Sequence, residues 1–318
     1  MASSRIIAWP VSGTSEGGCI PGTQDPAFTL HVPERLTLPI VIAAPHGGRH
    51  YPPGIEATMR EPEWSQLRLE DRLVDRLARE VAAASGAALL VAHAPRALLD
   101  LNRAPDDIDW SMVQGEGAPR ANRLASSANR RSRNGLGLVP RRLPGLGEIW
   151  RDALTPAALT ERIESIHRPY HAALGGVLEQ VRDQWGAVLL LDLHSMPPLK
   201  PRSGQDRPAE FVIGDRFGSS CSDLLAATAL RHLSAAERRV AHNRPYAGGY
   251  VLERHGSPRR GIHALQLEVC RTAYLEAELR DAGPRFPGMV RLLSGLVRAL
   301  ATETAALGAD GRMRHAAE

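Results

Sequence analysis

Short apolar runs, separated by longer segments with helical spacing, constrain the fold of this 318-residue chain most strongly. The runs are apolar along nearly their whole length, which is typical of strands buried on both faces of a sheet. We expect strands at 38–44, 87–94, 187–194, 210–213, 239–242 and 263–269. Helical spacing occupies 63–84, 156–184, 220–233 and 289–307. This alternation predicts a three-layer α/β fold with helices on both faces of a central sheet.

No shift in composition and no internal repeat divides the chain, so we expect a single domain over residues 1–318. Residues 105–146 have no clear period and are rich in Gly, Asn, Ser and Arg. A segment of that length is too long for an ordinary connection, and we expect an irregular insertion that forms a lid or a pocket loop. About the first 25 and the last 10 residues are expected to be loose ends.

The net charge of the chain alone excludes few classes of function. Lys and Arg number 39 and Asp and Glu 35, and every basic residue except Lys200 is an arginine. Arginine suits a bidentate grip on carboxylates or phosphates. The densest basic run, at 130–142, has no aromatic neighbour, which argues against a nucleic-acid interface. We therefore expect no nucleic-acid partner.

The chain shows no signal for a membrane or for secretion. Its longest apolar stretch falls short of the ~20 residues that a spanning helix needs, and its first residues lack the pattern of a secretory signal. We expect a cytoplasmic protein with no membrane partner. Cys19, Cys221 and Cys270 are too scattered for a cysteine-based zinc site.

Pro45-His46-Gly47-Gly48 directly follows the strand predicted at 38–44. Ligands of open α/β sheets bind at the carboxyl ends of strands, so His46 is a candidate ligand. The alternative is a structural or solvated histidine in a glycine-rich turn.

Asp192 and His194 end a run of leucines. Residues two apart on a strand point to the same face, and burying two polar groups there is costly unless they are paired or bind a metal. Asp192 could accept the second ring N–H of His194 and orient that ring toward a ligand. The alternative is a structural Asp–His hydrogen bond.

Two further carboxylates stand in regular elements. Asp71 and Asp75 share one flank of the helix predicted at 63–84, where a solvated face is the alternative. Glu268 lies in the strand predicted at 263–269, on the face opposite Leu265 and Leu267. It is either a structural, ion-paired glutamate or a carboxylate kept dry so that it can act as a base.

Asn102-Arg103 and the segment that ends in Gly248-Gly249-Tyr250 follow two of the predicted strands. An amide beside a guanidinium offers donors for a substrate carboxylate. Each of these signals is weak alone.

Together these motifs resemble the N-formylglutamate amidohydrolase family, from about residue 38 to about residue 280 and in the family's order. The motifs are PHGG at 45–48, ED and D within 70–75, DLNR at 100–103, DLHSM at 192–196, NRPYAGGY at 243–250 and QLEVCR at 266–271. The family is similar to zinc carboxypeptidases and aspartoacylases. The resemblance therefore implies a three-layer αβα fold of the zinc exopeptidase type with a mixed central sheet.

The resemblance also implies roles for single residues. It makes His46, Asp71 and His194 the ligands of one zinc ion per chain and Glu268 the general base, with Asn102, Arg103, Tyr250 and Arg271 in the substrate pocket. Two histidines and one carboxylate are a donor set of catalytic zinc. Carboxypeptidases place a glutamate three residues after the first histidine, where this chain has Arg49. We choose Asp71 over Glu70, because a helix presents the two about 100° apart and only one should face the metal.

The resemblance implies a zinc-dependent hydrolase that cleaves the amide bond of an N-formyl or N-acyl acidic amino acid, such as N-formylglutamate, to formate and the free amino acid. The partner would be that small acidic substrate. Two alternatives stay open. One is a zinc carboxypeptidase or deacylase with a different N-acyl substrate, and the other is a non-catalytic, arginine-rich protein that binds anions or nucleic acid.

Overall fold

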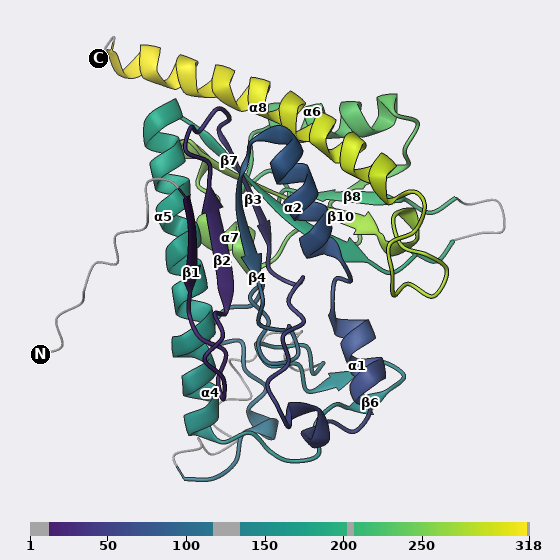
Figure 1. Cartoon of the computed structure of the whole chain (residues 1–318). Coiled ribbons are helices and arrows are strands. Elements are labelled where there is room, and N and C mark those ends of the chain that lie inside the picture. Colours follow the sequence, from purple (N-terminus) through teal and green to yellow (C-terminus); the bar gives the residue numbers. More distant parts are fainter. Residues whose placement is uncertain (1–12, 117–133, 202–206, 317–318) are drawn as a thin grey trace, which may run out of the picture.

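The computed structural model describes residues 13–116, 134–201 and 207–316 (Figure 1). Within these residues, eight strands form one sheet in the order β1-β2-β4-β3-β7-β10-β8-β9. The strands of this sheet are β1 (Gly13–Gly17), β2 (Phe28–Val32), β3 (Ile40–Ala44), β4 (Ala88–Ala92), β7 (Val188–Met196), β8 (Phe211–Gly214), β9 (Val240–His242) and β10 (Ile262–Cys270). A separate short ladder joins β5 (Arg142–Leu143) to β6 (Gly147–Glu148).

The sheet is mixed. Its central strands β4, β3, β7 and β10 run parallel to one another. On one side β2 pairs antiparallel with β4, and β1 pairs antiparallel with β2. On the other side β8 pairs antiparallel with β10. The four parallel strands therefore end at the same edge of the sheet, where ligands of α/β proteins bind.

Helices cover both faces of the sheet, as the apolar strands require. One face packs against α2 (Val74–Ser85), α6 (Asp223–Ala235) and α8 (Phe286–Ala316), and the other against α5 (Arg168–Trp185) and α7 (Tyr250–His255) (Figure 1). Alternate residues of one strand serve the two sides: Ile40 and Ile42 belong to the first core, and Val41 and Ala43 to the second. The prediction of a three-layer fold with a mixed sheet is confirmed.

The remaining helices connect this framework. α1 (Pro62–Leu69) precedes α2, and α4 (Pro156–Arg162) continues through a π-helical turn at Ile163–His167 into α5. Single 3₁₀ turns occur at Ile55–Thr58, Trp110–Met112, Pro258–Arg260 and Arg271–Ala273. All six predicted strands are present with small changes at their ends.

Two expectations about the chain ends were wrong. Residues 13–17 were expected to be loose, but they form β1, because β2 offers them an antiparallel partner. The last residues were expected to be loose as well, yet α8 continues to Ala316. The described part of the chain contains no helix that is both long and apolar enough to cross a membrane. The single domain and the lid function of residues 105–146 stay predictions, and 117–133 lie outside the described residues.

Candidate metal centre

The faces of β7 and β10 that pack against α5 change from apolar to polar toward their carboxyl ends. On β7, Leu190 is followed by Asp192 and His194, which share its face because side chains alternate along a strand. On β10, Ala264 is likewise followed by Gln266 and Glu268. In the parallel register, Glu268 lies opposite His194. Two polar pairs therefore meet at the carboxyl edge of an otherwise apolar sheet face.

A break between α1 and α2 brings Asp71 to the same place. The sequence predicted one helix over 63–84, but the helix ends at Leu69 and resumes at Val74, with Leu73 in the left-handed region at φ 57°. The backbone N–H of Asp71 donates to the carbonyl of His46 at 3.0 Å. The prediction of an unbroken helix was wrong because these residues bond to the loop after β3 instead of to their own helix.

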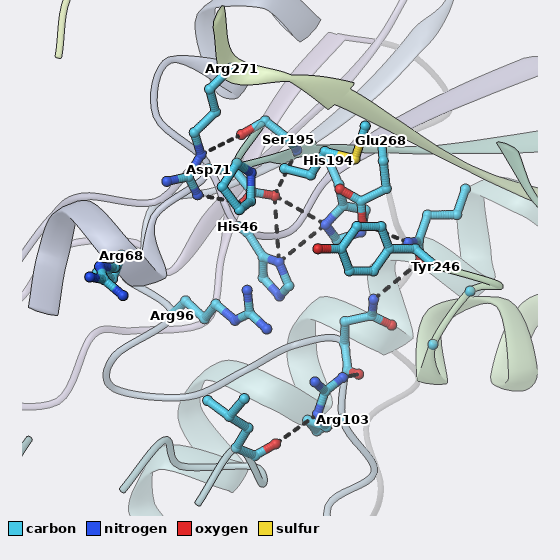
Figure 2. A pocket seen from close by; sticks show the side chains of 17 residues that line it. His46, Arg68, Asp71, Arg96, Arg103, His194, Ser195, Tyr246, Glu268 and Arg271 are labelled. Atoms are coloured by element: carbon cyan, nitrogen blue, oxygen red, sulfur yellow. Dashed lines mark hydrogen bonds and ion pairs between the residues drawn. The ribbon is translucent and has the colours of Figure 1, made fainter. Parts of the chain in front are cut away.

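Three side chains converge at this edge (Figure 2). The Nδ1 atoms of His46 and His194 are 3.1 Å apart, and Oδ2 of Asp71 lies 3.1 Å from Nδ1 of His194 and 3.6 Å from Nδ1 of His46. One ligand atom from each residue lies within 4.8 Å of the other two. All three residues are buried. They could hold a metal ion.

The far side of each imidazole is held by a second carboxylate. Nε2 of His46 bonds Oδ1 of Asp100 at 2.7 Å, and Nε2 of His194 bonds Oδ2 of Asp192 at 2.9 Å. When each Nε2 carries the proton that its carboxylate accepts, both Nδ1 atoms present lone pairs. Together with the carboxylate of Asp71, three acceptors then face one point. A cation bound at that point would interact favourably with all three acceptors, and two imidazoles with one carboxylate form a donor set that suits zinc.

The charges around this point favour a positive group. Burial opposes protonation of His194, but the charge of Asp192 and hydrogen bonds to Asp192 and Asp71 raise its pKa well above the usual range. Burial opposes ionisation of Asp71, yet hydrogen bonds from His194 and His46 lower its pKa. The negative charge gathered here holds a proton on an imidazole, and the same charge would attract a metal cation.

Glu268 faces the same space and is only 7 % exposed. Burial raises the pKa of its carboxyl group to about 7. Gln266 donates from Nε2 to Oε1 of Glu268 at 2.8 Å, which fixes the orientation of the carboxylate. A carboxylate of that pKa next to a candidate metal centre can accept and return a proton near neutral pH.

The four groups line a cavity of about 350 Å³. Its other lining residues include four arginines, which approach from α1, from the loops after β4 and from the end of β10. They are Arg68, Arg96, Arg103 and Arg271, all shown in Figure 2. The cavity therefore combines a metal-binding donor set with a cationic wall.

The structure places Asn102 and Arg103 in this wall, but their own side chains are already engaged. Oδ1 of Asn102 accepts from the backbone N–H of Val251 at 3.0 Å. Arg103 donates from Nη1 to the carbonyl of Asn102 at 2.7 Å. From behind, Nε2 of His167 bonds the carbonyl of Arg103, and Nε2 of His171 bonds that of Leu101. The π-helical turn and the first part of α5 thus fix the backbone of this segment.

Tyr250 lies elsewhere than the sequence suggested. It begins α7, its ring packs 5.6 Å from that of His167 and 5.2 Å from that of His171, and its hydroxyl accepts from Arg254 at 3.1 Å. It is not among the described residues that line the cavity, whereas Tyr246 is. The start of α7 turns the later tyrosine toward α5.

Glu70, the alternative to Asp71, faces a different cavity and accepts from the hydroxyl of Tyr51 at 3.0 Å. Arg271 lies at the cavity as predicted. It donates from Nε to Oγ of Ser195 at 3.3 Å and from Nη1 to the carbonyl of Leu67 at 2.9 Å.

Sequence reasoning missed several lining or supporting residues. Most of them stand inside the family motifs, so a signal existed for them: Asp100, Ser195, Tyr246 and Gln266. Arg96 follows the strand predicted at 87–94 by two residues, a position typical of binding residues. Arg68 lies within a helix and carried no signal.

The fold and this edge of the sheet define an α/β protein with a candidate metal centre, and the comparisons with known proteins give its family. The model of the family described as N-formylglutamate amidohydrolase matches residues 38–275. The solved structure of N-formylglutamate amidohydrolase from Ralstonia eutropha has 35% identity and a TM-score of 0.76, covering 87% of this chain and 98% of that one.

Two curated relatives carry related names. N-formylglutamate deformylase of Pseudomonas aeruginosa is 30% identical over 250 residues, which are 77% of this chain and 85% of the relative. The deformylase of Pseudomonas putida is 28% identical, over 75% of this chain and 82% of the relative. This chain belongs to the N-formylglutamate amidohydrolase family.

Proposed function

We propose that the chain is a metal-dependent amidohydrolase that cleaves N-formylglutamate with water to formate and glutamate. The names of its relatives support hydrolysis of this amide. The observation that carries the proposal is the convergence of His46, Asp71 and His194 on one point, with Glu268 beside it in a cationic cavity.

We propose one zinc ion per chain, held by Nδ1 of His46, Nδ1 of His194 and Oδ2 of Asp71. Three protein ligands leave a coordination position open, which distinguishes catalytic from structural zinc sites. A bound zinc ion would supply Lewis-acid polarisation of the acyl carbonyl and would lower the pKa of a water molecule toward ~7. Asp100 and Asp192 would keep the two imidazoles in the tautomer that binding needs.

Glu268 serves as the general base in this proposal. Its carboxylate takes a proton from the attacking water and then returns that proton to the nitrogen of the departing amine, so that one residue acts first as base and then as acid. Burial, which raises its pKa to about 7, suits both roles near neutral pH. Gln266 holds the carboxylate in place through Oε1.

The carboxylate next to the scissile amide would bind at the wall formed by Asn102, Arg103 and Arg96. Nε and Nη2 of Arg96 both lie 2.9 Å from Oδ2 of Asp100. Nη1 of Arg96 can therefore donate a hydrogen bond to the substrate carboxylate. Arg103 supports the wall through the carbonyls that it binds. After hydrolysis this group is the α-carboxylate of the released glutamate.

The proposal is tested by assaying the purified chain for formate release from N-formylglutamate, with metal analysis of the same sample. We expect about one zinc ion per chain, loss of activity with a chelator and recovery with zinc. A protein that binds no zinc under any condition, or that is fully active without metal, would contradict the proposed mechanism. A zinc-loaded protein that cleaves other N-acyl amino acids but not N-formylglutamate would contradict the proposed substrate.

A further inference from the structure

The four arginines of the cavity differ in how many of their donors the protein already uses. A guanidinium offers five N–H groups and accepts none. Arg271 uses all three of its nitrogens on the chain itself: it binds Oγ of Ser195, the carbonyls of Leu67 and Glu70, and Oδ1 of Asp71 at 3.5 Å. These bonds connect the end of β10 to the loop of Asp71. Arg271 therefore has a structural role beside the candidate metal centre, and its three nitrogens already have partners in the protein.

Two more arginines share the carboxylate of Asp100. Arg96 binds its Oδ2 through Nε and Nη2, and Nη2 of Arg103 lies 3.8 Å from the same oxygen. Arg103 also donates to the carbonyls of Leu136 and Asn102. These two charges lower the pKa of Asp100 and are partly neutralised by it, against the opposing effect of burial. They suit one substrate carboxylate close to the reaction centre.

Arg68 differs from the other three. Its side chain projects from α1 and is exposed, although it lines the cavity. The bond that the structure gives its guanidinium runs from Nη1 to the carbonyl of Pro144, at 3.3 Å. Among the described residues, no carboxylate lies within ion-pair distance of it. Figure 2 shows it to the side of Arg96, away from Glu268 and Tyr246. It therefore places an uncompensated positive charge at the mouth of the cavity.

An acidic N-acyl amino acid carries two carboxylates, one next to the amide and one at the end of its side chain. With the acyl carbonyl at the candidate metal centre, the first falls near Arg96 and Arg103, and the second must lie farther out. We propose that Arg68 binds this outer carboxylate and so determines the preference of the chain for acidic over neutral substrates. This inference rests on the proposed function and goes beyond it by assigning substrate specificity to a residue of α1.

The test compares two substrates that differ only in this charge, N-formylglutamate and N-formylglutamine. In the Arg68→Ala variant we expect kcat/KM for N-formylglutamate to fall at least tenfold and kcat/KM for N-formylglutamine to change less than twofold. Arg68→Lys should restore part of the loss, because a lysine keeps the charge without the fork. Arg231→Ala, at an exposed arginine of α6 that does not line the cavity, is the matched control and should leave both values unchanged.

A binding experiment separates failure of this inference from failure of the proposed hydrolysis. Calorimetry with the zinc-loaded protein measures glutarate, a dicarboxylate, against butyrate, a monocarboxylate of similar length, and needs no turnover. Arg68→Ala should weaken glutarate binding at least tenfold and leave butyrate binding within twofold. Equal losses for both ligands, or unchanged glutarate binding, would overturn the role of Arg68 whether or not the protein hydrolyses N-formylglutamate.

Discussion

Glu268 on β10 lies directly opposite His194 on β7, in a parallel register that also pairs Gln266 with Asp192. Side chains in register on neighbouring parallel strands project to the same face. The proposed base is therefore held beside a proposed metal ligand by backbone hydrogen bonds of the two central strands. The rigidity of the sheet, and not that of a loop, fixes their separation.

Replacing Glu268 with Gln should abolish turnover without removing the metal. The amide has the size of the carboxylate but cannot accept a proton, and general bases contribute about 10²–10⁴-fold to rates. We expect kcat to fall at least a hundredfold while the zinc content stays near that of the wild-type chain. Formate release and metal analysis measure the two quantities, and a variant that keeps more than a fifth of the activity would remove Glu268 from this role.

Asp192→Asn should weaken zinc binding. The asparagine can still accept from Nε2 of His194, but it lacks the charge that strengthens this hydrogen bond. Loss of such an outer partner typically costs about 10–100-fold in metal affinity. Competition with a chelator measures the change. Asp183→Asn, at an exposed position, is the control, and equal affinities in the two variants would contradict a supporting role for Asp192.

Gly48→Ala should destabilise the loop that carries His46. A Cβ built on Gly48 would lie 2.1 Å from the carbonyl oxygen of Ala94, so the backbone has to move. Overpacking of this kind costs about 1–3 kcal/mol. Gly175→Ala in α5 is the contrasting variant, because its Cβ meets nothing closer than 3.9 Å and alanine favours a helix by about 0.5–1 kcal/mol. Denaturant unfolding should give opposite signs for the two, and loss of stability of equal size in both would refute the argument.

The stability of the protein should fall with pH below the usual pKa of histidine. Burial lowers the pKa of His263 from 6.5 to about 4, so between these values the unfolded chain is protonated and the folded chain is not. Stability is thus retained above pH 6.5 and lost as the pH falls toward 4, by roughly 3 kcal/mol for this residue. Urea unfolding at several pH values measures the slope.

His263→Asn isolates this contribution. The amide oxygen can replace Nδ1, which accepts from the backbone N–H of Ser222 at 3.3 Å and so supports the start of α6. Since asparagine does not titrate, the variant should lose less stability than the wild-type chain between pH 6.5 and 4. Identical pH slopes would show that His263 is not the group responsible.

Much of the sheet and part of the site could be predicted from local pattern. The strand at 187–194 and its pair Asp192 and His194 followed from a run of leucines and the two-residue period of a strand. The face of Glu268 followed in the same way, and the parallel register of β7 and β10 places all three side chains at one edge. For His46, the family motif and the position after a strand agreed with the observed placement.

Other features had no local signal. The helical period of 63–84 continues through Glu70 and Asp71, and only contacts with the loop of His46 break the helix there. Tyr246 and Tyr250 are the same residue type within one motif, so the sequence does not distinguish them. The start of α7 at Tyr250 decides that Tyr246 is the one that reaches the cavity.

The sequence by itself determined six of the eight strands of the central sheet and which of their side chains share a strand face, because these depend on short-range periodicity. It also showed, by resemblance, which residues carry the family motifs. Only the tertiary structure decided that Asp71 and not Glu70 joins the two histidines, and which arginines have donors left for a ligand. Those properties depend on hydrogen bonds and charges between residues far apart in the chain, such as Arg271 with Leu67. Local patterns do not encode such partners, because packing of the whole sheet and its helices brings them together.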